Sequence, residues 1–492
     1  MNRSRLIGPG RLALTALAAA GLVTGAALSP AADHTRSEGP SARPSTGASF
    51  EPVVSADLSC PGPEFSGISG VEDIDVSASL GIATAPDSVL GSSVKVTGEG
   101  KVTVRSGKDT TGDPVTERGT TTTVDDLPNG RASEVLAIGA LAPGLAATQE
   151  WVVARSEIRG LATVSCASPG SDLWLLAGGG AAGRQERLIL TNSGANEVTV
   201  DLEVLGLKGV VPSPTGSTVV PARGRVALLV DAVTGAEESP AVHVRATGGS
   251  VRAVMSDIWL DGSVPAGAET TVPSAAPSTR QVIPAAIVGV GGSIRIAVPD
   301  RQQAVVSARI LGEDGPVPLA KGVTRVPGRS TGELSLTGLK QGKYAVELTS
   351  DVPITAALWS SWRLGKTPGD FIWAPSTESS TGLLAAAFPR SEDARERNLS
   401  LVSSAGPATA SVTWRSGDKW TTKSVGLGQD AAVTLNLGEA ESVWVLRTSG
   451  RGEIRAAMGT VAGKGGGERL VSVSPLVETA VTSSVSSAHP IS

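Results

Sequence analysis

Short runs of alternating apolar and polar residues recur along the chain, and such alternation predicts β-strands with one buried face. Four segments share one pattern, in which two such runs are joined by a tight turn. They are residues 153–164, 242–255, 346–358 and 443–458. Turns such as Gly-Gly or Gly-Arg-Gly between alternating runs are typical of β-hairpins. The copies lie about 100 residues apart, which indicates an internal repeat.

The aligned copies share one apolar position, which is occupied by Leu161, Val251, Ile354 and Ile454. Alternate residues of a strand share one face, so we expect these four side chains to point into hydrophobic cores. Arg252 and Arg455 follow directly on two of these positions, and the same alternation predicts that they face solvent.

The repeat length identifies the fold class. Several short strands per repeat, with turn residues about every ten positions, are typical of a β-sandwich of immunoglobulin-like kind. A propeller blade would repeat after about 40–50 residues, so that architecture is excluded. We therefore predict an all-β protein built from tandem immunoglobulin-like β-sandwich repeats.

The predicted order is a signal peptide or anchor at 1–32, a disordered spacer at 33–57, a degenerate N-terminal β domain at 58–183, sandwich repeats at 184–285, 286–390 and 391–478, and a disordered tail at 479–492. Segments rich in Pro, Gly and Ser at 262–283 and 365–387 are interpreted as extended connectors. Residues 134–145 are interpreted as a short helix or a loop insertion.

The N-terminus has the pattern of an export signal. Arg3, Arg5 and Arg11 precede an uncharged apolar run at 12–28, and small residues follow it up to Ala32. The run is close to the shortest length that spans a bilayer, so an uncleaved membrane anchor is the alternative to cleavage. Both interpretations predict an extracellular or cell-surface protein.

Composition narrows the range of partners. The net charge is −5, so there is no overall basic field to attract nucleic acid. Contact with a membrane is expected only through the N-terminal segment. The chain is 40% hydrophobic, which favours folded β-structure over disorder.

Cys60 and Cys166 are the only cysteines, and in an exported protein an even number predicts a disulfide between them. A nucleophilic cysteine would need a histidine partner, and His34 and His489 lie in segments expected to be disordered. His243 alone remains, which is too few ligands for zinc as well.

Other candidate chemistry is weak. The glycine-rich stretch at 178–183 resembles a phosphate loop but lacks the following Lys and precedes a strand pattern, so we interpret it as a tight connector. Acidic residues at 72–75 and at Asp125–Asp126 could offer oxygen ligands to Ca²⁺, but solvated turns are the simpler interpretation. We expect no metal and no cofactor.

Tryptophan is over-represented, with nine Trp against four Phe and one Tyr. Exposed Trp residues stack on sugars and anchor interfaces, and Trp414 and Trp420 beside a predicted turn are the candidates for ligand stacking. The alternative, which we favour, is that each sandwich buries a Trp in its core.

The chain resembles an exported family of actinobacteria catalogued only as a domain of unknown function. The resemblance rests on Cys60-Pro61, on Cys166 followed by residues 172–179, and on the strand pattern beginning Leu188-Ile189-Leu190. It implies an extracytoplasmic location and no particular activity.

These observations predict a non-catalytic structural or interaction protein of the cell envelope, with an envelope protein or a glycan as partner. A glycan- or wall-binding sandwich array is the first alternative, and an enzyme of unrecognised type is the second.

Export can be tested by mass spectrometry of the protein purified from its own cells. We expect a mature N-terminus close to Ala32, or an intact N-terminus in the membrane fraction if the apolar run stays as an anchor. An intact Met1 on protein from the soluble cytoplasmic fraction would contradict both forms of the export hypothesis.

Overall fold

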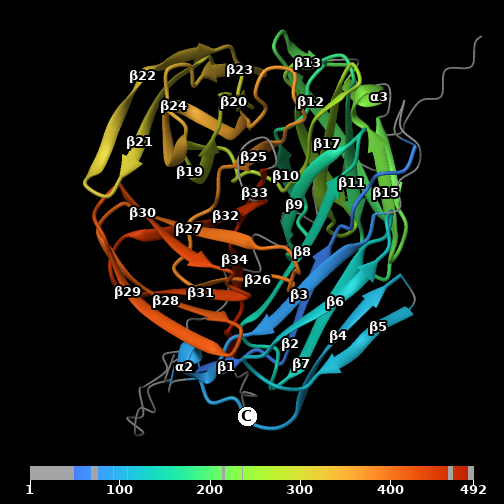
Figure 1. Cartoon of the computed structure of the whole chain (residues 1–492), viewed down its shortest axis with the longest axis vertical. Coiled ribbons are helices and arrows are strands. Elements are labelled where there is room, and N and C mark those ends of the chain that lie inside the picture. Colours follow the sequence, from blue (N-terminus) through green and yellow to red (C-terminus); the bar gives the residue numbers. More distant parts are fainter. Residues whose placement is uncertain are drawn as a thin grey trace, which may run out of the picture. The chain divides into compact units, whose positions relative to one another are not determined.

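Antiparallel strands dominate the structure, a computed structural model that describes residues 49–67, 76–91, 94–107, 109–212, 216–234, 237–463 and 469–485. The chain divides into Met1–Ser49 and Phe50–Ser492, and the elements below belong to the second unit apart from the first residue of β1. The predicted export segment, most of the predicted spacer, His34, His489 and the acidic residues 72–75 lie outside the described residues. In the part that is described, the strands form four sandwiches (Figure 1).

The first sandwich pairs a sheet in the order β2-β7-β4-β5 with one in the order β6-β3-β8-β9. Its elements are β2 (Ser55–Cys60), β3 (Ala78–Thr84), α2 (Asp87–Leu90), β4 (Gly100–Ser106), β5 (Asp109–Val115), β6 (Thr121–Leu127), β7 (Ser133–Gly139), β8 (Leu145–Ala154) and β9 (Arg159–Ser165). One hydrophobic cluster takes side chains from both sheets, for example Ile82 and Val135.

The second sandwich pairs β10-β16-β12-β13, with β14 also on β12, against β15-β11-β17-β18. Its elements are β10 (Asp172–Leu175), β11 (Arg184–Thr191), β12 (Val198–Gly206), β13 (Gly209–Val211), β14 (Ser217–Val220), β15 (Arg225–Leu229), α3 (Val230–Thr234), β16 (Ala241–Thr247), β17 (Arg252–Asp261) and β18 (Val264–Thr271).

In the third sandwich one long strand, β24, belongs to both sheets: its first half pairs with β19 and β21, and its second half with β20 and β25. The elements are β19 (Ser278–Val288), β20 (Gly291–Val298), β21 (Ala304–Gly312), β22 (Gly315–Val326), β23 (Ser330–Ser335), β24 (Gly342–Ser361) and β25 (Phe371–Pro375).

The fourth sandwich pairs β29-β28-β31-β26-β34 with β30-β27-β32-β33. Its elements are β26 (Leu383–Ala387), β27 (Arg395–Ser404), β28 (Ala408–Ser416), β29 (Lys419–Leu427), β30 (Ala431–Gly438), β31 (Ser442–Gly450), β32 (Glu453–Ala462), β33 (Leu470–Pro475) and β34 (Val477–Thr479). A separate pair is formed by β1 (Ser49–Pro52) and β35 (Thr482–Val485).

The prediction of an all-β protein made of sandwich repeats is confirmed, and the immunoglobulin-like topology stays a prediction. Several boundaries differ. β19 and β26 begin before the predicted repeat starts at 286 and 391, and the predicted connectors contain β18 and β25. β1 and β2 begin inside the predicted spacer, β35 lies in the predicted tail, and β7 replaces the helix or loop insertion at 134–145. Pro and Gly residues in these segments favour the interpretation as connectors, although β18 pairs with the adjacent β17 and β25 with the preceding β24. For β1 and β35 the partner comes from the other end of the described chain.

The predicted hairpins are correct only for residues 153–164, where β8 pairs directly with β9. In the second copy β16 and β17 belong to opposite sheets, so the turn between them crosses the sandwich. The fourth copy crosses in the same way between β31 and β32. Alternation reveals which face of a strand is buried but not which strand it pairs with.

Val251, Ile354 and Ile454 are buried in the cores of their own sandwiches, as predicted. Leu161 is also buried, but it lies on β9, the last strand of its sandwich, and contacts Ala462 and Leu470 of the fourth sandwich.

Arg252 and Arg455 are buried, so the prediction that they face solvent is wrong. Arg252 donates to the carbonyl of Ser165, and Arg455 donates to the carbonyl of Thr377. Each acceptor lies just before the sandwich that carries the arginine. The second face of these strands therefore packs against the end of the preceding repeat, not against water.

The last strands of the four sandwiches pack on one another. β9 contacts β18 and β33, and β25 contacts the same two strands, so the contacts run in a closed cycle through all four sandwiches. Figure 1 shows β9, β25 and β33 close together, with the outer strands of their sandwiches around them. We call this arrangement the ring.

The first and fourth sandwiches close the ring. β26 and β34 contact β8, and the backbone approaches so closely that a Cβ on Gly81 would lie 2.0 Å from the carbonyl carbon of Phe388. At the same end, Val53 donates its N–H to the carbonyl of Val481 at 3.1 Å.

The ring predicts that residues 50–492 unfold together. Val251→Asp places an unpaired charge in the second core and should lower the free energy of unfolding by more than about 3 kcal/mol. We expect one calorimetric transition that moves to lower temperature as a whole. Val323→Asp is the matched control, because Val323 is 65% exposed. A separate early transition, with the other sandwiches melting as before, would contradict the ring as a cooperative unit.

Candidate functional site

The centre of the ring contains a buried carboxylate that touches all four last strands. Asp370 directly precedes β25 and accepts the N–H of Phe371 at 2.9 Å, of Val471 on β33 at 2.9 Å and of Leu161 on β9 at 3.4 Å. Ala268 on β18 also donates its N–H to this carboxylate. Burial raises the pKa of Asp370 well above its usual value.

A second acid lies beside it. Glu269 on β18 accepts from the Ser472 hydroxyl at 3.1 Å, and Ser472 in turn accepts the N–H of Thr163 at 3.0 Å. The other carboxylate oxygen of Glu269, Oε2, has no hydrogen-bond partner among the described residues. Burial raises the pKa of Glu269 well above its usual value, and the charge of nearby Asp370 raises that pKa further.

Paired carboxyl groups with shifted pKa values occur in acid–base enzymes, but they must reach a substrate. Asp370 and Glu269 are almost fully buried, and neither lines any of the four cavities considered in the described part of the chain. Their partners are backbone N–H groups and a serine of the ring itself, so their role is structural.

A third buried network joins the second and third sandwiches. Arg184 pairs with Asp257, and Trp373 donates its indole N–H to the same carboxylate at 2.6 Å. Burial raises the pKa of the neighbouring Glu186 to about 8, and the charge of Asp257 adds to that rise. The Arg184 guanidinium lies 5.4–6.0 Å from the centres of four aromatic rings, those of Trp259, Trp359, Phe371 and Trp373.

Several of the tryptophans therefore pack at the interfaces between sandwiches. Trp373 contributes to the hydrophobic cluster of the second sandwich, although it lies on β25 of the third. Trp444 contributes to a cluster with Ala83 and Ala146 of the first sandwich, although it lies on β31 of the fourth.

Trp414 and Trp420 are not brought together. In the β28–β29 pairing, Trp414 lies opposite Thr421 and Trp420 lies opposite Arg415, so the two rings project from opposite faces of the sheet. Trp414 packs against the fourth core, whereas Trp420 is 37% exposed and its ring centre lies 5.8 Å from that of Trp444. A shared stacking surface for a sugar is not formed.

The predicted disulfide between Cys60 and Cys166 is present, and it joins β2 to the end of β9. It leaves no cysteine of the described residues free to act as a nucleophile. His243 stacks on Trp174 with ring centres 4.1 Å apart, and its Nε2 lies 2.8 Å from Asp172.

The glycine-rich stretch at 178–183 does not have the polarity of a phosphate loop. Arg295 donates to the carbonyls of Ala177 and Gly178, each at 2.9 Å. A phosphate loop would point several N–H groups at its ligand. Here the N–H of Gly179 donates to the Glu186 carboxylate at 2.7 Å, while the carbonyl of Gly178 faces the Arg295 guanidinium. This geometry is consistent with a connector.

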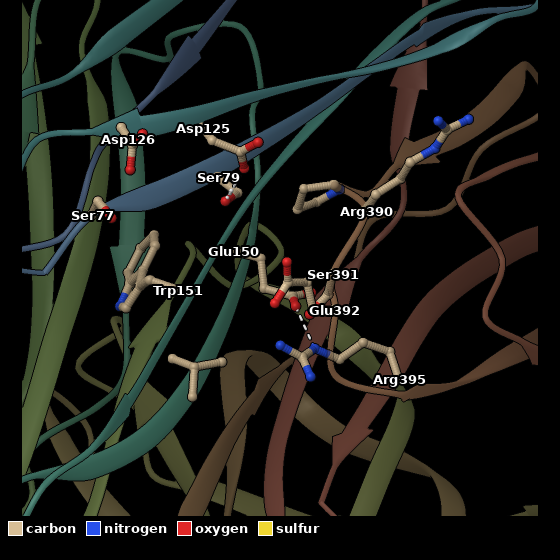
Figure 2. A pocket seen from close by; sticks show the side chains of 12 residues that line it. Ser77, Ser79, Asp125, Asp126, Glu150, Trp151, Arg390, Ser391, Glu392 and Arg395 are labelled. Carbon is tan, nitrogen blue, oxygen red and sulfur yellow. Dashed lines mark hydrogen bonds and ion pairs between the residues drawn. The ribbon is translucent and has the colours of Figure 1, made fainter.

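The largest described cavity, about 380 Å³, lies where the first and fourth sandwiches close the ring. Figure 2 shows Asp125 and Asp126 on one side of it, and Arg390, Glu392 and Arg395 on the other. Asp125 and Asp126 belong to β6, Arg390 and Glu392 to the segment that leads into β27, and Arg395 to the start of β27. The cavity therefore exists only when both ends of the repeat array meet.

An ion pair across the junction forms part of the cavity wall. Glu150 on β8 accepts from Arg395 at 2.6 Å and from Arg397 at 3.1 Å, and all three side chains are nearly buried. Both carboxylate oxygens are used, so Glu150 holds the two sandwiches together here.

The other carboxylates are available. Asp125 accepts from the Ser79 hydroxyl at 2.5 Å, whereas Asp126 and Glu392 are exposed and have no ion pair within the described ranges. The sequence favours a solvated turn at Asp125 and Asp126. They are exposed but lie at the end of β6, where they line the cavity.

Sequence reasoning missed this site because its two walls lie more than 200 residues apart. One local signal was present: Gln149-Glu150 interrupts the apolar run of β8, and a charge inside such a run indicates a buried partner.

The fold is thus an all-β ring of sandwiches with a polar cavity of about 380 Å³ between its first and last members. Residues 120–438, well over half of the chain, match a Family of unknown function (DUF5719), and the chain belongs to this family. The matched range begins at the N-terminal end of β6 and ends with β30, so it spans the second and third sandwiches completely.

No curated protein matches the chain. Among the described residues, no helix has both the length and the apolar character needed to cross a bilayer.

The central acids predict a pH dependence. Folding raises the pKa values of Glu269 and Asp370, so the folded state holds protons that the unfolded chain releases above about pH 4.5. Stability should therefore fall as the pH rises from 5 to 8, with Glu186 adding to the fall. Below about pH 4 the arginine-paired Glu333 and Asp430, whose pKa values are lowered in the fold, should reverse the trend.

Melting temperatures measured across this range test the prediction. Glu269→Gln resembles the neutral acid and should flatten the slope between pH 5 and 8, while the exposed-site control Asp314→Asn should leave it unchanged. Stability that rises steadily from pH 5 to pH 8 would show that the central acids are ionised.

Proposed function

We propose that this protein is an exported, non-catalytic interaction protein of the cell envelope, and that the cavity at the ring closure is its binding site. Export is supported by the arginine and apolar pattern of residues 1–32 and by the Cys60–Cys166 disulfide, because disulfides persist in oxidising compartments.

The observation that carries the proposal is the cavity itself. Its volume of about 380 Å³ falls within the range typical of small-ligand sites. In the ion pairs between sandwiches, such as Arg395 with Glu150, each charge is neutralised by a charge of the neighbouring sandwich. Asp126 and Glu392 instead line the cavity without a cationic partner among the described residues.

A glycan is the ligand class that these groups favour. Ser77, Ser79 and Ser391 contribute hydroxyls to the wall, and carboxylates and hydroxyls are strong partners for sugar hydroxyls. The cavity is therefore a better candidate for a glycan-binding site than the surface around Trp414 and Trp420.

Support for the non-catalytic part of the proposal comes from Glu150, the buried acid of the cavity wall, whereas the exposed acids Asp126 and Glu392 are tested by the assay below. Hydrolysis of a glycoside needs two carboxyl groups facing each other across the bond, one of them able to give a proton. Glu150 accepts from two arginines through both oxygens, which leaves it unsuited to that role.

Binding of the mature protein to purified envelope glycans, measured by co-sedimentation or on an array, tests the proposal. Asp126→Asn and Glu392→Gln each remove one charge and keep the shape of the side chain, so each should weaken binding about tenfold without lowering the melting temperature. Asp314→Asn, in an exposed turn of the third sandwich, should bind normally.

Equal binding by the cavity variants would place the ligand elsewhere. Release of shortened glycan during the assay would show that the protein is an enzyme.

A further inference from the structure

A second, smaller cavity of about 190 Å³ lies between the first and second sandwiches. One wall is the segment from Gly130 to Glu134, which leads into β7, and the other is the end of β11 together with the turn at residues 223–225. Unlike the cavity at the ring closure, this one has more basic than acidic lining residues: Arg131, Arg223 and Arg225 against Glu134.

Two of these arginines are free. Arg131 and Arg223 are exposed, come from different sandwiches, and have no ion pair or side-chain hydrogen bond within the described ranges. Arg225 is already paired with Glu64 and donates to the carbonyl of Pro61 at 2.9 Å.

The one acid in the wall does not cancel this charge. Glu134 lies 4.0 Å from Arg105, and its pKa is raised by burial and by the charge of Asp57. The charges of Arg105 and Arg223 lower this pKa, so Glu134 offsets part of the positive charge. It is the single acid in a lining that holds three arginines. The cavity therefore keeps excess positive charge.

Arg223 is held in a strained backbone. Its φ is 50°, in the left-handed region that glycine adopts readily and arginine does not. Its N–H donates to the carbonyl of Gly194 at 3.0 Å, and Gly224 donates to Pro221 at 3.0 Å, so the turn itself fixes this conformation. An arginine here costs stability that glycine would not, and strain of this kind is found at binding sites.

A buried hydroxyl in the same wall lacks a partner. Thr191 is 3% exposed, and its Oγ1 makes no hydrogen bond with the described residues. It lies opposite Arg225 in the β11–β15 pairing. A buried hydroxyl without a partner is unfavourable, and an acceptor in the cavity would satisfy it.

We propose that this cavity binds an oxyanion, a carboxylate or phosphate group carried by a ligand. Guanidinium groups pair with both anions through two parallel hydrogen bonds, and Arg131 and Arg223 approach from opposite walls. The Thr191 hydroxyl donates a further hydrogen bond to the anion. The proposal does not depend on the cavity at the ring closure, since the two share no lining residue.

Isothermal titration of the mature protein at low ionic strength, with inorganic phosphate and separately with glucuronate, tests the site. Saturable binding of phosphate alone, of glucuronate alone or of both supports the proposal and identifies the anion. Absence of heat and of thermal stabilisation with both probes overturns it.

Three variants locate the binding. Arg223→Gly removes one charge and relieves the backbone, so it should weaken binding about tenfold while the melting temperature stays equal or rises. Thr191→Val removes only the hydroxyl and should weaken binding several-fold without loss of stability. Arg325→Gln, on the exposed face of β22, is the matched control and should bind like the parent protein.

Binding that survives unchanged in both Arg223→Gly and Arg131→Gln would show that the anion is held elsewhere, and would overturn the assignment.

Discussion

The Asp370 carboxylate is the point on which the arrangement of the sandwiches depends. It accepts backbone N–H groups from β9, β25 and β33, and a further one from β18, so a single side chain satisfies donors from every sandwich. Edge strands normally leave such donors to water. Here they are buried against one another, and unpaired N–H groups at this depth would each cost free energy.

The neighbourhood of Asp370 explains why the repeats pack so closely. β9 approaches β18 until a Cβ on Gly160 would lie 2.1 Å from the carbonyl oxygen of Ala268, so only glycine fits there. Backbones at this distance cannot slide past one another. The interfaces behave as the interior of one body, and the candidate sites that lie across them inherit that rigidity.

The sequence predicted the features that depend on local alternation. The buried positions of Val251, Ile354 and Ile454 follow from the two-residue period of a strand, and the Cys60–Cys166 pair follows from there being only two cysteines. Arg252 shows the limit of that reasoning, because alternation places it on the second face of its strand but says nothing of the sandwich that covers that face.

Asp370 itself follows Pro368 and Gly369 in a segment that the sequence predicts to be an extended connector. Its importance comes from strands about 100 and 200 residues away, which no local pattern reveals. The cavity at the ring closure has the same origin, since Asp126 and Glu392 meet only after the first and fourth sandwiches join.

The closed cycle of last strands also bears on how such a chain can evolve. In an open array, unequal recombination can add or remove a repeat, because each copy contacts only its neighbours. In this ring β9 must meet β33, and the oxygens of Asp370 are already shared among four strands. A fifth copy would find no place at the centre, and the loss of one would leave donors unmatched. The geometry of the centre therefore fits the number of copies as closely as a core fits its side chains.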